Sequence, residues 1–412
     1  MASRLLVLAL ASLASAQQIG KTIPEQQPAL TTWRCTKAGG CKSVNNTVTL
    51  EATARRILSV ADPLEECKVG RAPCDDAATC GKACSLEGID YASRGVWTKG
   101  DSLTLRQWDD SGRTVSPRIY LLGADGKTYE NMSLLNMEFT FDVELAKLPC
   151  GMNGALYLSE MELDGGRALA NGTNPAGATY GTGYCDAQCP KLDWINGQAN
   201  TARRGVCCNE MDLWEANNAA QVYTPHPCRD ERVYGCKTDI ECGQPEGVCD
   251  QWGCSYNQYQ ANPNYYGPGK NFTVDSSRKI TVVTQFHTDP ATGKLNNVRR
   301  LFLQDGKLIA NAAPSSGVAD MSNAYCKATA SWTEKRGGLA KMGDAVGRGM
   351  VLIFSLWNDV GGFMNWMDTG KNGPCNETEG NPDLIYQHTP DAQITFSAIK
   401  WGEINSTYTK PM

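Results

Sequence analysis

The sequence predicts an all-β protein built as a sandwich of antiparallel sheets with few short helices. Three observations predict this fold. Several segments alternate apolar and polar residues with a period of two, turn signals separate these segments, and helical patterns are few. Many short strands of this kind bury their apolar faces by packing one sheet against another.

The clearest strand signal lies in residues 137–145. Phe139, Phe141, Val143 and Leu145 alternate there with polar residues, which predicts one buried side and one side facing solvent. Two segments, 75–86 and 338–347, are expected to form helices of a few turns. Similar alternation predicts further strands at residues 118–122, 155–161, 279–287, 350–356 and 393–401.

Tight turns and long loops should connect the strands. Asp125-Gly126 and Asp305-Gly306 are dipeptides that favour hairpin turns. Glycine accounts for 41 of the 412 residues, as such turns require. Because no Pro/Ser/Thr-rich linker and no internal repeat interrupts the sequence, we expect residues 17–412 to form one domain.

The first residues predict export from the cell. Arg4 precedes the apolar run Leu5–Ala11, and Ala14-Ser15-Ala16 fits a small-residue cleavage site. The apolar run is too short to span a bilayer. Residues 1–16 are therefore expected to be a signal peptide, and the mature protein to be secreted.

Cysteine usage agrees with an oxidising compartment. The 18 cysteines are an even number, which in an exported chain predicts nine disulfides rather than zinc sites. Spacing alone does not decide which cysteines pair. Six sequons agree with a secreted glycoprotein, at Asn45, Asn131, Asn171, Asn271, Asn376 and Asn405.

The formal net charge of −5 comes without a basic block. This pattern argues against nucleic acid and anionic membranes as partners, and it suits a neutral or weakly acidic substrate. A monomer is the default expectation.

Residues 209–217 read NEMDLWEAN and place three acids, Glu210, Asp212 and Glu215, on one short apolar segment. Crowded carboxylates repel one another. Glycoside hydrolysis uses such a cluster, because it needs one ionised carboxylate and one protonated carboxyl beside the scissile bond. No set of histidines or carbonyl-rich loop accompanies the acids, so neither a metal nor another cofactor is expected.

The spacing of the acids predicts an irregular strand. In a regular strand Glu210 and Asp212 share a face and Glu215 points to the other. If all three act together, a β-bulge or kink must lie between Asp212 and Glu215. The alternative is an ordinary strand whose acids face solvent.

Longer motifs surround these acids. Residues 206–217 (VCCNEMDLWEAN), 224–228 (TPHPC), 147–161 (KLPCGMNGALYLSEM) and 180–189 (YGTGYCDAQC) together resemble glycoside hydrolase family 7, the fungal cellulases. The closing KWGEINSTY extends the resemblance over essentially the whole mature chain. The resemblance implies a curved, concanavalin A-like jelly-roll sandwich with a cleft along its concave face.

The resemblance also implies a retaining mechanism. Glu210 matches the nucleophile, Glu215 the general acid/base, and Asp212 the acid that hydrogen-bonds the nucleophile. Retention needs the two catalytic carboxyl groups about 5–5.5 Å apart. Glu215 must start protonated, so we expect neighbouring negative charge to raise its pKa.

The same resemblance implies which residues bind substrate. His226 is expected beside the acid/base, on the leaving-group side. Trp357 and Trp366 match aromatic platforms that stack on sugar rings. Polar cleft positions are matched by Asn153, Tyr157, Asp186 and Gln188.

Four departures from the tunnel-forming cellobiohydrolases of this family favour an endo-β-1,4-glucanase with an open cleft. The loops within Cys242–Cys249 and Trp366–Cys375 are short, and the second lacks the family's product-site arginine. Gln260 stands where a second such arginine would be. Glu51–Arg56 lacks two tryptophans that guide a chain end into the tunnel. No cellulose-binding module is expected.

By the same resemblance, all 18 cysteines pair. The implied disulfides are Cys35–Cys41, Cys67–Cys84, Cys74–Cys80, Cys150–Cys375, Cys185–Cys208, Cys189–Cys207, Cys228–Cys249, Cys236–Cys242 and Cys254–Cys326. Three other functions stay open at this point: a cellobiohydrolase of the same family, a family 16 laminarinase or licheninase, and a non-catalytic carbohydrate-binding protein of lectin-like fold.

Overall fold

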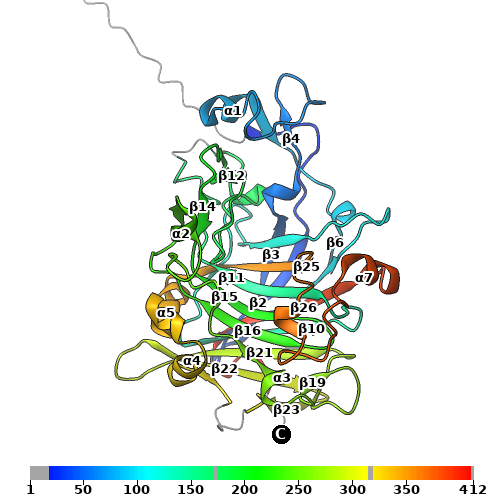
Figure 1. The fold of residues 1–412 in the computed structure, drawn as a ribbon, viewed down its shortest axis with the longest axis vertical. Coiled ribbons are helices and arrows are strands. Elements are labelled where there is room, and N and C mark those ends of the chain that lie inside the picture. The colour runs from blue at the N-terminus through cyan, green and yellow to red at the C-terminus, as the bar shows by residue number, and fades with distance from the viewer. Residues whose placement is uncertain (1–17, 171–173, 314–318, 410–412) are drawn as a thin grey trace, which may run out of the picture.

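The computed structural model describes residues 18–170, 174–313 and 319–409 (Figure 1). The expected signal peptide and the sequon at Asn171 lie outside these residues. Most strands belong to one hydrogen-bonded sheet of 17 strands that turns back on itself to form two layers. The predicted β-sandwich is therefore confirmed.

The inner layer carries the site described below. Its strands run antiparallel to their neighbours. In spatial order they are β16 (Gln221–His226), β15 (Glu210–Ala216), β11 (Met152–Ser159), β25 (Met350–Asn358), β8 (Arg118–Leu122) and β3 (Gly40–Leu50).

The outer layer continues from β3. One of its pairings, between β2 and β26, is parallel, which the sequence did not predict. The β6–β7 hairpin pairs with β26 through β7. The strands are β2 (Ala29–Thr36), β26 (Gln393–Glu403), β10 (Met137–Glu144), β21 (Ile280–Thr288), β22 (Leu295–Gln304) and β23 (Lys307–Ala310), with β6 (Val96–Lys99) and β7 (Ser102–Arg106).

The main hydrophobic core lies between the two layers. The rings of Phe141 on β10 and Trp214 on β15 meet edge to face at 6.0 Å. The rings of Phe354 on β25 and Phe396 on β26 lie 5.5 Å apart. Contacts of this kind fix the two layers against each other, because aromatic pairs bury large apolar area in a defined geometry.

Helices are short and peripheral. The longest, α5, packs against β22 and confirms the expected helix at 338–347. No helix in the described part of the chain is long and apolar enough to cross a membrane. The helices are α1 (Ala77–Ala83), α2 (Asp239–Cys242), α3 (Gln258–Ala261), α4 (Asn323–Thr329), α5 (Gly338–Arg348), α6 (Asn365–Asp368) and α7 (Pro382–His388).

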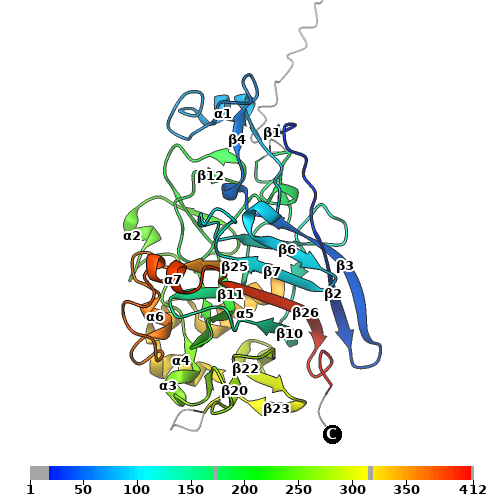
Figure 2. The same ribbon diagram turned by 90° about the vertical axis from the view of Figure 1, so that its right-hand side faces the viewer.

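Smaller strands shape the loops. Two of the small sheets, one formed by β1, β5 and β4 and the other by β12 and β13, lie at one end of the molecule, away from β22 and β23 (Figure 2). The smaller strands are β1 (Gln18–Ile19), β4 (Ile57–Ser59), β5 (Cys84–Leu86), β9 (Asn131–Met132), β12 (Trp194–Ile195), β13 (Gln198–Ala199), β14 (Gly205–Cys207), β17 (Tyr234–Cys236), β18 (Tyr256–Asn257), β19 (Tyr266–Gly267), β20 (Val274–Asp275) and β24 (Met321–Ser322).

The predicted strands are present, with small shifts at their ends. The strand expected at 155–161 begins earlier, at Met152, and ends at Ser159. The helix expected at 75–86 stops at Ala83, because Cys84–Leu86 pairs as a strand with β4. Asp305 and Gly306 both have positive φ and join β22 to β23 as the turn signal predicted.

One prediction about β10 is wrong. The polar side of this strand was expected to face solvent, yet Glu138 and Thr140 are buried. The C-terminal segment covers them, and the main-chain N–H groups of Asn405, Ser406 and Thr407 all donate to the Glu138 carboxylate at 2.8–2.9 Å. A buried carboxylate is tolerated when hydrogen bonds satisfy it.

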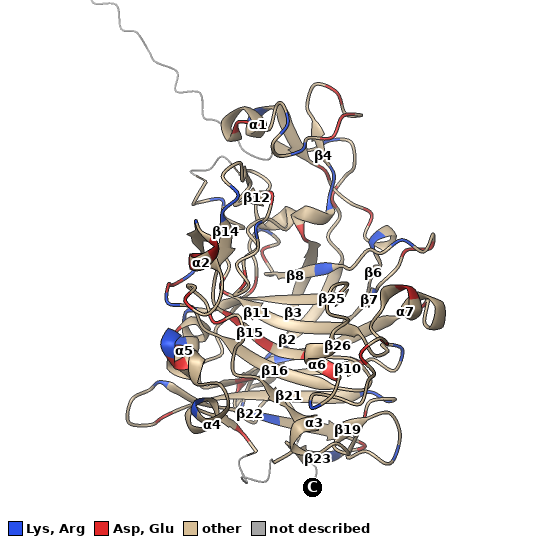
Figure 3. Cartoon of the chain, in the orientation of Figure 1, with Lys and Arg blue, Asp and Glu red and all other residues tan. Residues whose placement is uncertain are grey.

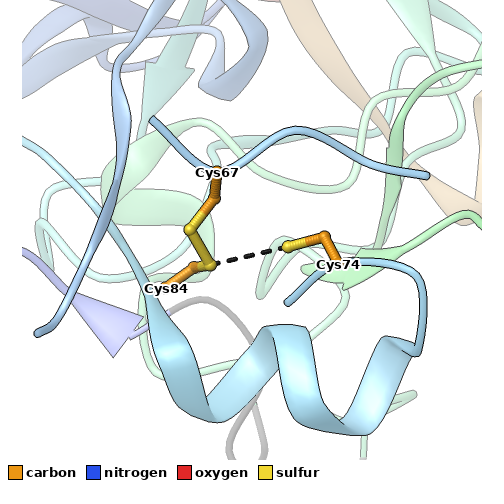
Figure 4. Close-up of side chains that lie close together, drawn as sticks. All are labelled: Cys67, Cys74 and Cys84. Atoms are coloured by element: carbon orange, nitrogen blue, oxygen red, sulfur yellow. Dashed lines mark hydrogen bonds between the residues drawn. A yellow bond between two sulfur atoms is a disulfide. The ribbon is translucent and has the colours of Figure 1, made fainter. Parts of the chain in front are cut away.

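All nine expected disulfides are present. Figure 4 shows the cluster formed by Cys67, Cys84 and Cys74, where Sγ of Cys74 lies 3.5 Å from Sγ of Cys84. Cys74 is itself bonded to Cys80. These sulfur atoms are therefore held in two adjacent disulfides and are not free thiolates.

Candidate active site

A β-bulge in β15 brings the three acids to one face. Tyr157 of β11 pairs with Asp212, whereas the preceding Leu156 pairs with Trp214, so Leu213 is an extra residue in β15. The register with β16 shifts at the same place, between Asp212 and Glu215. Leu213 and Trp214 both enter the core, and Glu215 returns to the face of Asp212. The predicted bulge is confirmed.

A buried arginine lies beneath this bulge. Arg300, on β22, is fully buried and donates from Nη2 to the main-chain oxygen of Leu213. Its guanidinium lies over the ring of Tyr223, 4.4 Å from the centroid. No ion pair is recorded for it in the described part of the chain, and burial lowers its pKa to about 10. Arg300 thus satisfies a carbonyl at the place where the strand ladder is irregular.

The acids line a cleft of about 530 Å³ on the inner layer. Figure 3 shows acidic positions on β15 among strands that otherwise carry few charges. The other lining residues come from neighbouring strands and from loops. They include Arg118, Tyr157, Tyr184, Asp186, Gln188, Thr224, His226, Gln251, Trp252, Ser255, Ser355, Trp357, Asp359 and Trp366.

The environment of Glu215 favours the protonated form. Burial raises its pKa to about 8, and the negative charge of Asp212 adds to the effect. The amide of Asn153 donates to Glu215 Oε1 at 2.9 Å, which opposes the rise. The group therefore carries a proton through the weakly acidic and neutral pH range, as a general acid requires.

Glu210 has a different environment. Burial, followed by the charges of Asp212 and Asp186, raises its pKa as well. The main-chain N–H of Ala187, however, donates to Glu210 Oε2 at 3.0 Å, and the imidazole of His226 also favours its ionised form. These two groups stabilise negative charge on Glu210, which a nucleophile needs.

His226 is held between Asp212 and a main-chain carbonyl. Its Nδ1 lies 2.8 Å from the oxygen of Asp250, and its Nε2 lies 2.9 Å from Asp212 Oδ2. A carbonyl only accepts, so Nδ1 carries a hydrogen. The contact with Asp212 then holds one further proton between the two groups, and it fixes the orientation of Asp212.

A network of hydrogen-bonded polar side chains lines the cleft next to Glu210. The hydroxyls of Tyr157 and Tyr184 lie 3.1 Å apart, and the Tyr184 hydroxyl donates to Asp186 at 2.5 Å. The main-chain N–H of Gln188 donates to the other oxygen of Asp186 at 2.8 Å. Arg118 lies over the Tyr184 ring at 3.9 Å. This network fixes the positions of the hydroxyls and the carboxylate that face the cleft.

Three indoles line the cleft. Trp366 on α6 is 45% exposed and Trp252 is 53% exposed, so both have free ring faces. Trp252 is supported by Trp332, which meets it edge to face at 5.6 Å. Trp357 is the penultimate residue of the apolar strand β25 and is half-buried. Exposed indoles in a polar cleft offer apolar surfaces for the C–H faces of sugar rings.

The structure differs from the sequence prediction for Asn153. We expected Asn153 to contact substrate, but its side chain is fully buried and lies behind Glu215 rather than in the cleft. The other predicted contact residues, His226, Tyr157, Asp186 and Gln188, all line the cleft, as do both predicted tryptophans.

His226 was expected beside Glu215. It contacts Asp212 directly and lies close enough to Glu215 to favour the ionised form of that acid. The expected hydrogen bond between Asp212 and Glu210 stays a prediction. Sequence reasoning missed Arg118, Tyr184 and Trp252. The sequence did contain a signal for Trp252. It lies between Cys249 and Cys254, which are near each other in the sequence, and an aromatic residue between two such cysteines is held in a surface loop.

The family model for Glycosyl hydrolase family 7 matches residues 19–408. The chain belongs to glycosyl hydrolase family 7. The chain is similar to the endo-β-1,4-glucanase celB of Emericella nidulans. The two sequences are 48% identical over 423 residues, which cover 97% of each chain. The sequence resemblance to this family is therefore confirmed, and the family 16 alternative is excluded.

Solved structures of family 7 enzymes share the fold. The native endocellulase EGI of Humicola insolens gives a TM-score of 0.90 at 43% identity, covering 95% of this chain and 100% of its own. A family 7 cellobiohydrolase from Daphnia pulex gives 0.89 at 32% identity with the same coverage. The backbone alone thus does not separate the two activities, whereas sequence identity is higher to the endocellulase.

Proposed function

We propose that this family 7 chain is a secreted endo-β-1,4-glucanase that cuts internal bonds of cellulose and related β-glucans with retention of configuration. The observation that carries the proposal is the bulge in β15. Because of this bulge, the side chains of Glu210 and Glu215 line the same cleft. Secretion rests on the predicted signal peptide and agrees with the nine disulfides. Residues 17–412 form one catalytic domain in this proposal.

The first step uses both glutamates. The Glu210 carboxylate attacks the anomeric carbon while Glu215 gives its proton to the leaving glycosidic oxygen, and the C–O bond to the departing chain breaks. The high pKa of Glu215, about 8, keeps that proton available. The product of this step is a glycosyl ester on Glu210.

The second step reverses the roles. Glu215, now ionised, takes a proton from water, and the water oxygen attacks the anomeric carbon and displaces Glu210. Two inversions at one carbon give net retention. Asp212, fixed by His226 at 2.9 Å, adds to the effect of burial in raising the pKa values of Glu210 and Glu215.

Substrate binding uses the indoles and the network of hydrogen-bonded polar side chains next to Glu210. Trp357, Trp366 and Trp252 stack on successive sugar rings, while Tyr157 and Asp186 accept or donate to sugar hydroxyls. Stacking on an indole contributes affinity but tolerates several orientations of the sugar ring. The hydrogen bonds to sugar hydroxyls orient the ring next to the scissile bond. No cofactor takes part in this proposal.

An open cleft favours internal cuts. Trp366 and Trp252 are about half exposed, so a chain can enter from the side. Gln260 donates to Asn372 at 2.7 Å and lies outside the cleft lining, where it does not grip product. The relative from Emericella nidulans is named an endo-β-1,4-glucanase, which agrees with this assignment.

The test is a comparison of viscosity with reducing ends on a soluble cellulose derivative. An endo-acting enzyme lowers viscosity sharply after few cuts. A slow fall in viscosity with steady release of cellobiose would instead indicate a cellobiohydrolase. The Glu210→Gln variant is the control: it should bind the polymer without turnover, whereas a non-catalytic lectin would show binding and no turnover in the unaltered chain.

A further inference from the structure

Residues of β4 and β12 and of the loops beside them line a second hollow. These two strands lie at one end of the molecule (Figures 1 and 2). Its volume is about 650 Å³. Cationic side chains and one indole dominate its lining, although the chain as a whole has a net charge of −5. We call it the basic hollow and define it by Arg56, Lys68, Arg71, Arg94 and Trp194.

The acids that line the basic hollow are already paired. Glu66 binds Arg56 at 3.2 Å, and Asp193 binds Arg203 at 2.6 Å. The remaining lining cation, Arg55, is buried and forms an ion pair with Glu25. None of these groups carries uncompensated charge.

Three cations remain uncompensated. Within the described residues, no carboxylate is recorded in an ion pair with Lys68, Arg71 or Arg94, and no side-chain hydrogen bond is recorded for them. Three positive charges around one concavity repel each other, and their field attracts an anion into it. A hollow built this way suits a ligand with carboxylate groups, which accept from both ammonium and guanidinium donors.

A narrow hollow shares wall residues with both the catalytic cleft and the basic hollow. Tyr184 lines both the cleft and this narrow hollow, whose volume is about 20 Å³. Thr53 and Trp194 line both that narrow hollow and the basic hollow. The basic hollow therefore lies close to the cleft, where Trp194 and the three cations line one concavity that a polysaccharide extending beyond the cleft could reach.

The walls of the basic hollow are fixed by a cross-link. Cys67 lies in its lining and is bonded to Cys84, and this bridge closes the loop that carries Lys68 and Arg71 (Figure 4). Preorganised donors lose less freedom on binding than mobile ones.

We propose that the basic hollow binds carboxylate-bearing sugar residues of the polysaccharide that occupies the cleft, so that the enzyme prefers β-1,4-glycans with acidic substituents over neutral ones. This inference rests on the proposed function. It adds a distal subsite, in which Trp194 stacks on the ring and Lys68, Arg71 and Arg94 bind its carboxylate.

The test compares two soluble polymers with the same β-1,4-glucan backbone, carboxymethylcellulose and neutral hydroxyethylcellulose. The triple variant Lys68→Gln/Arg71→Gln/Arg94→Gln should raise KM for the charged polymer relative to the neutral one by about fivefold, as expected for loss of three exposed charge contacts. High salt should reduce the same preference in the unaltered enzyme, because screening weakens exposed ion pairs.

A matched control removes three exposed lysines from the opposite end of the molecule. The variant Lys270→Gln/Lys307→Gln/Lys327→Gln has the same net charge as the triple variant, so it should keep the ratio of the two KM values. Equal ratios in both variants would overturn the proposal, since the preference would then reflect net charge alone. A salt-independent ratio in the unaltered enzyme would overturn it as well.

A binding measurement separates this proposal from the endoglucanase proposal. Calorimetry on the Glu210→Gln variant should show tighter binding of a β-1,4-xylan oligosaccharide with glucuronic acid side groups than of the undecorated oligosaccharide. Adding the three hollow substitutions should remove the difference. Lack of turnover on both polymers would contradict the endoglucanase proposal only, whereas equal binding of the two oligosaccharides would contradict the basic hollow.

Discussion

Asn153 and Glu215 lie on adjacent strands, and the amide of Asn153 donates a 2.9 Å hydrogen bond to Glu215 Oε1. Asn153 is fully buried, so this donor is fixed by the fold and not by substrate. It holds Glu215 in place and lowers its pKa against the larger effect of burial. Asn153 is therefore a positioning residue.

Replacing Asn153 by Leu should change the pH dependence of the reaction. The substitution keeps the volume and removes the donor, so the pKa of Glu215 rises further. Because Glu215 acts as an acid when protonated, the alkaline limb of the kcat/KM profile should move to higher pH. The measurement is a pH–rate profile of both proteins. An unchanged limb, or one moved to lower pH, would contradict the assignment of Glu215 as the acid.

Glu215 should make the protein less stable at alkaline pH. Its pKa is about 8 in the folded protein against an ordinary value of 4.5, so the folded state binds more protons between these values. The contribution is fully present below pH 4.5 and is lost as pH rises towards 8. Glu215→Gln cannot ionise and escapes this loss.

The check is chemical unfolding of both proteins at weakly acidic and weakly alkaline pH. The free energy of unfolding of Glu215→Gln, relative to the unaltered protein, should increase with pH by on the order of several kcal/mol. Glu210 and Asp212 also titrate in both proteins, so the difference between them isolates Glu215. A difference that stays constant with pH would argue against a buried, protonated Glu215.

Arg300 should matter for catalysis without touching substrate. Arg300→Met removes the donor to the Leu213 carbonyl, which relaxes the bulge that orients Glu215. A misplacement of about 1 Å in a catalytic group costs on the order of 10²-fold in rate. We therefore expect kcat to fall by 10- to 100-fold with little change in KM.

The neighbouring Arg299 provides the matched control for this prediction. Its side chain is about half exposed and lies 3.9 Å from Asp320, on the other side of β22. Arg299→Met should leave kcat and KM close to those of the unaltered enzyme. If both variants lose activity equally, the effect reflects β22 as a whole and not the contact with Leu213.

The sequence predicted the fold where periodicity was strong. Alternation at 137–145 and the Asp305-Gly306 turn located β10 and the β22–β23 hairpin, because these signals are local. The apolar run at 350–356 does not show which side faces the cleft, so Trp357 was placed by family resemblance. The disulfide pairing came from the same resemblance.

The site was predictable in its residues and less so in its contacts. The spacing of Glu210, Asp212 and Glu215 required a bulge if all three share a face, and the bulge is present. The burial of Glu138 depends on a C-terminal segment far along the chain. The partners of Asn153 and His226 depend on neighbouring strands. None of these tertiary contacts leaves a periodic pattern in the sequence.

The most direct measurement is to trap the glycosyl ester. A 2-deoxy-2-fluoro cellobioside with a good leaving group slows the second step, and peptide mass spectrometry then locates the attached sugar. We predict a label on Glu210, with no labelling of the Glu210→Gln variant. A label on Glu215 or Asp212, or turnover without any covalent label, would contradict the assignment of Glu210 and Glu215 to one double-displacement reaction.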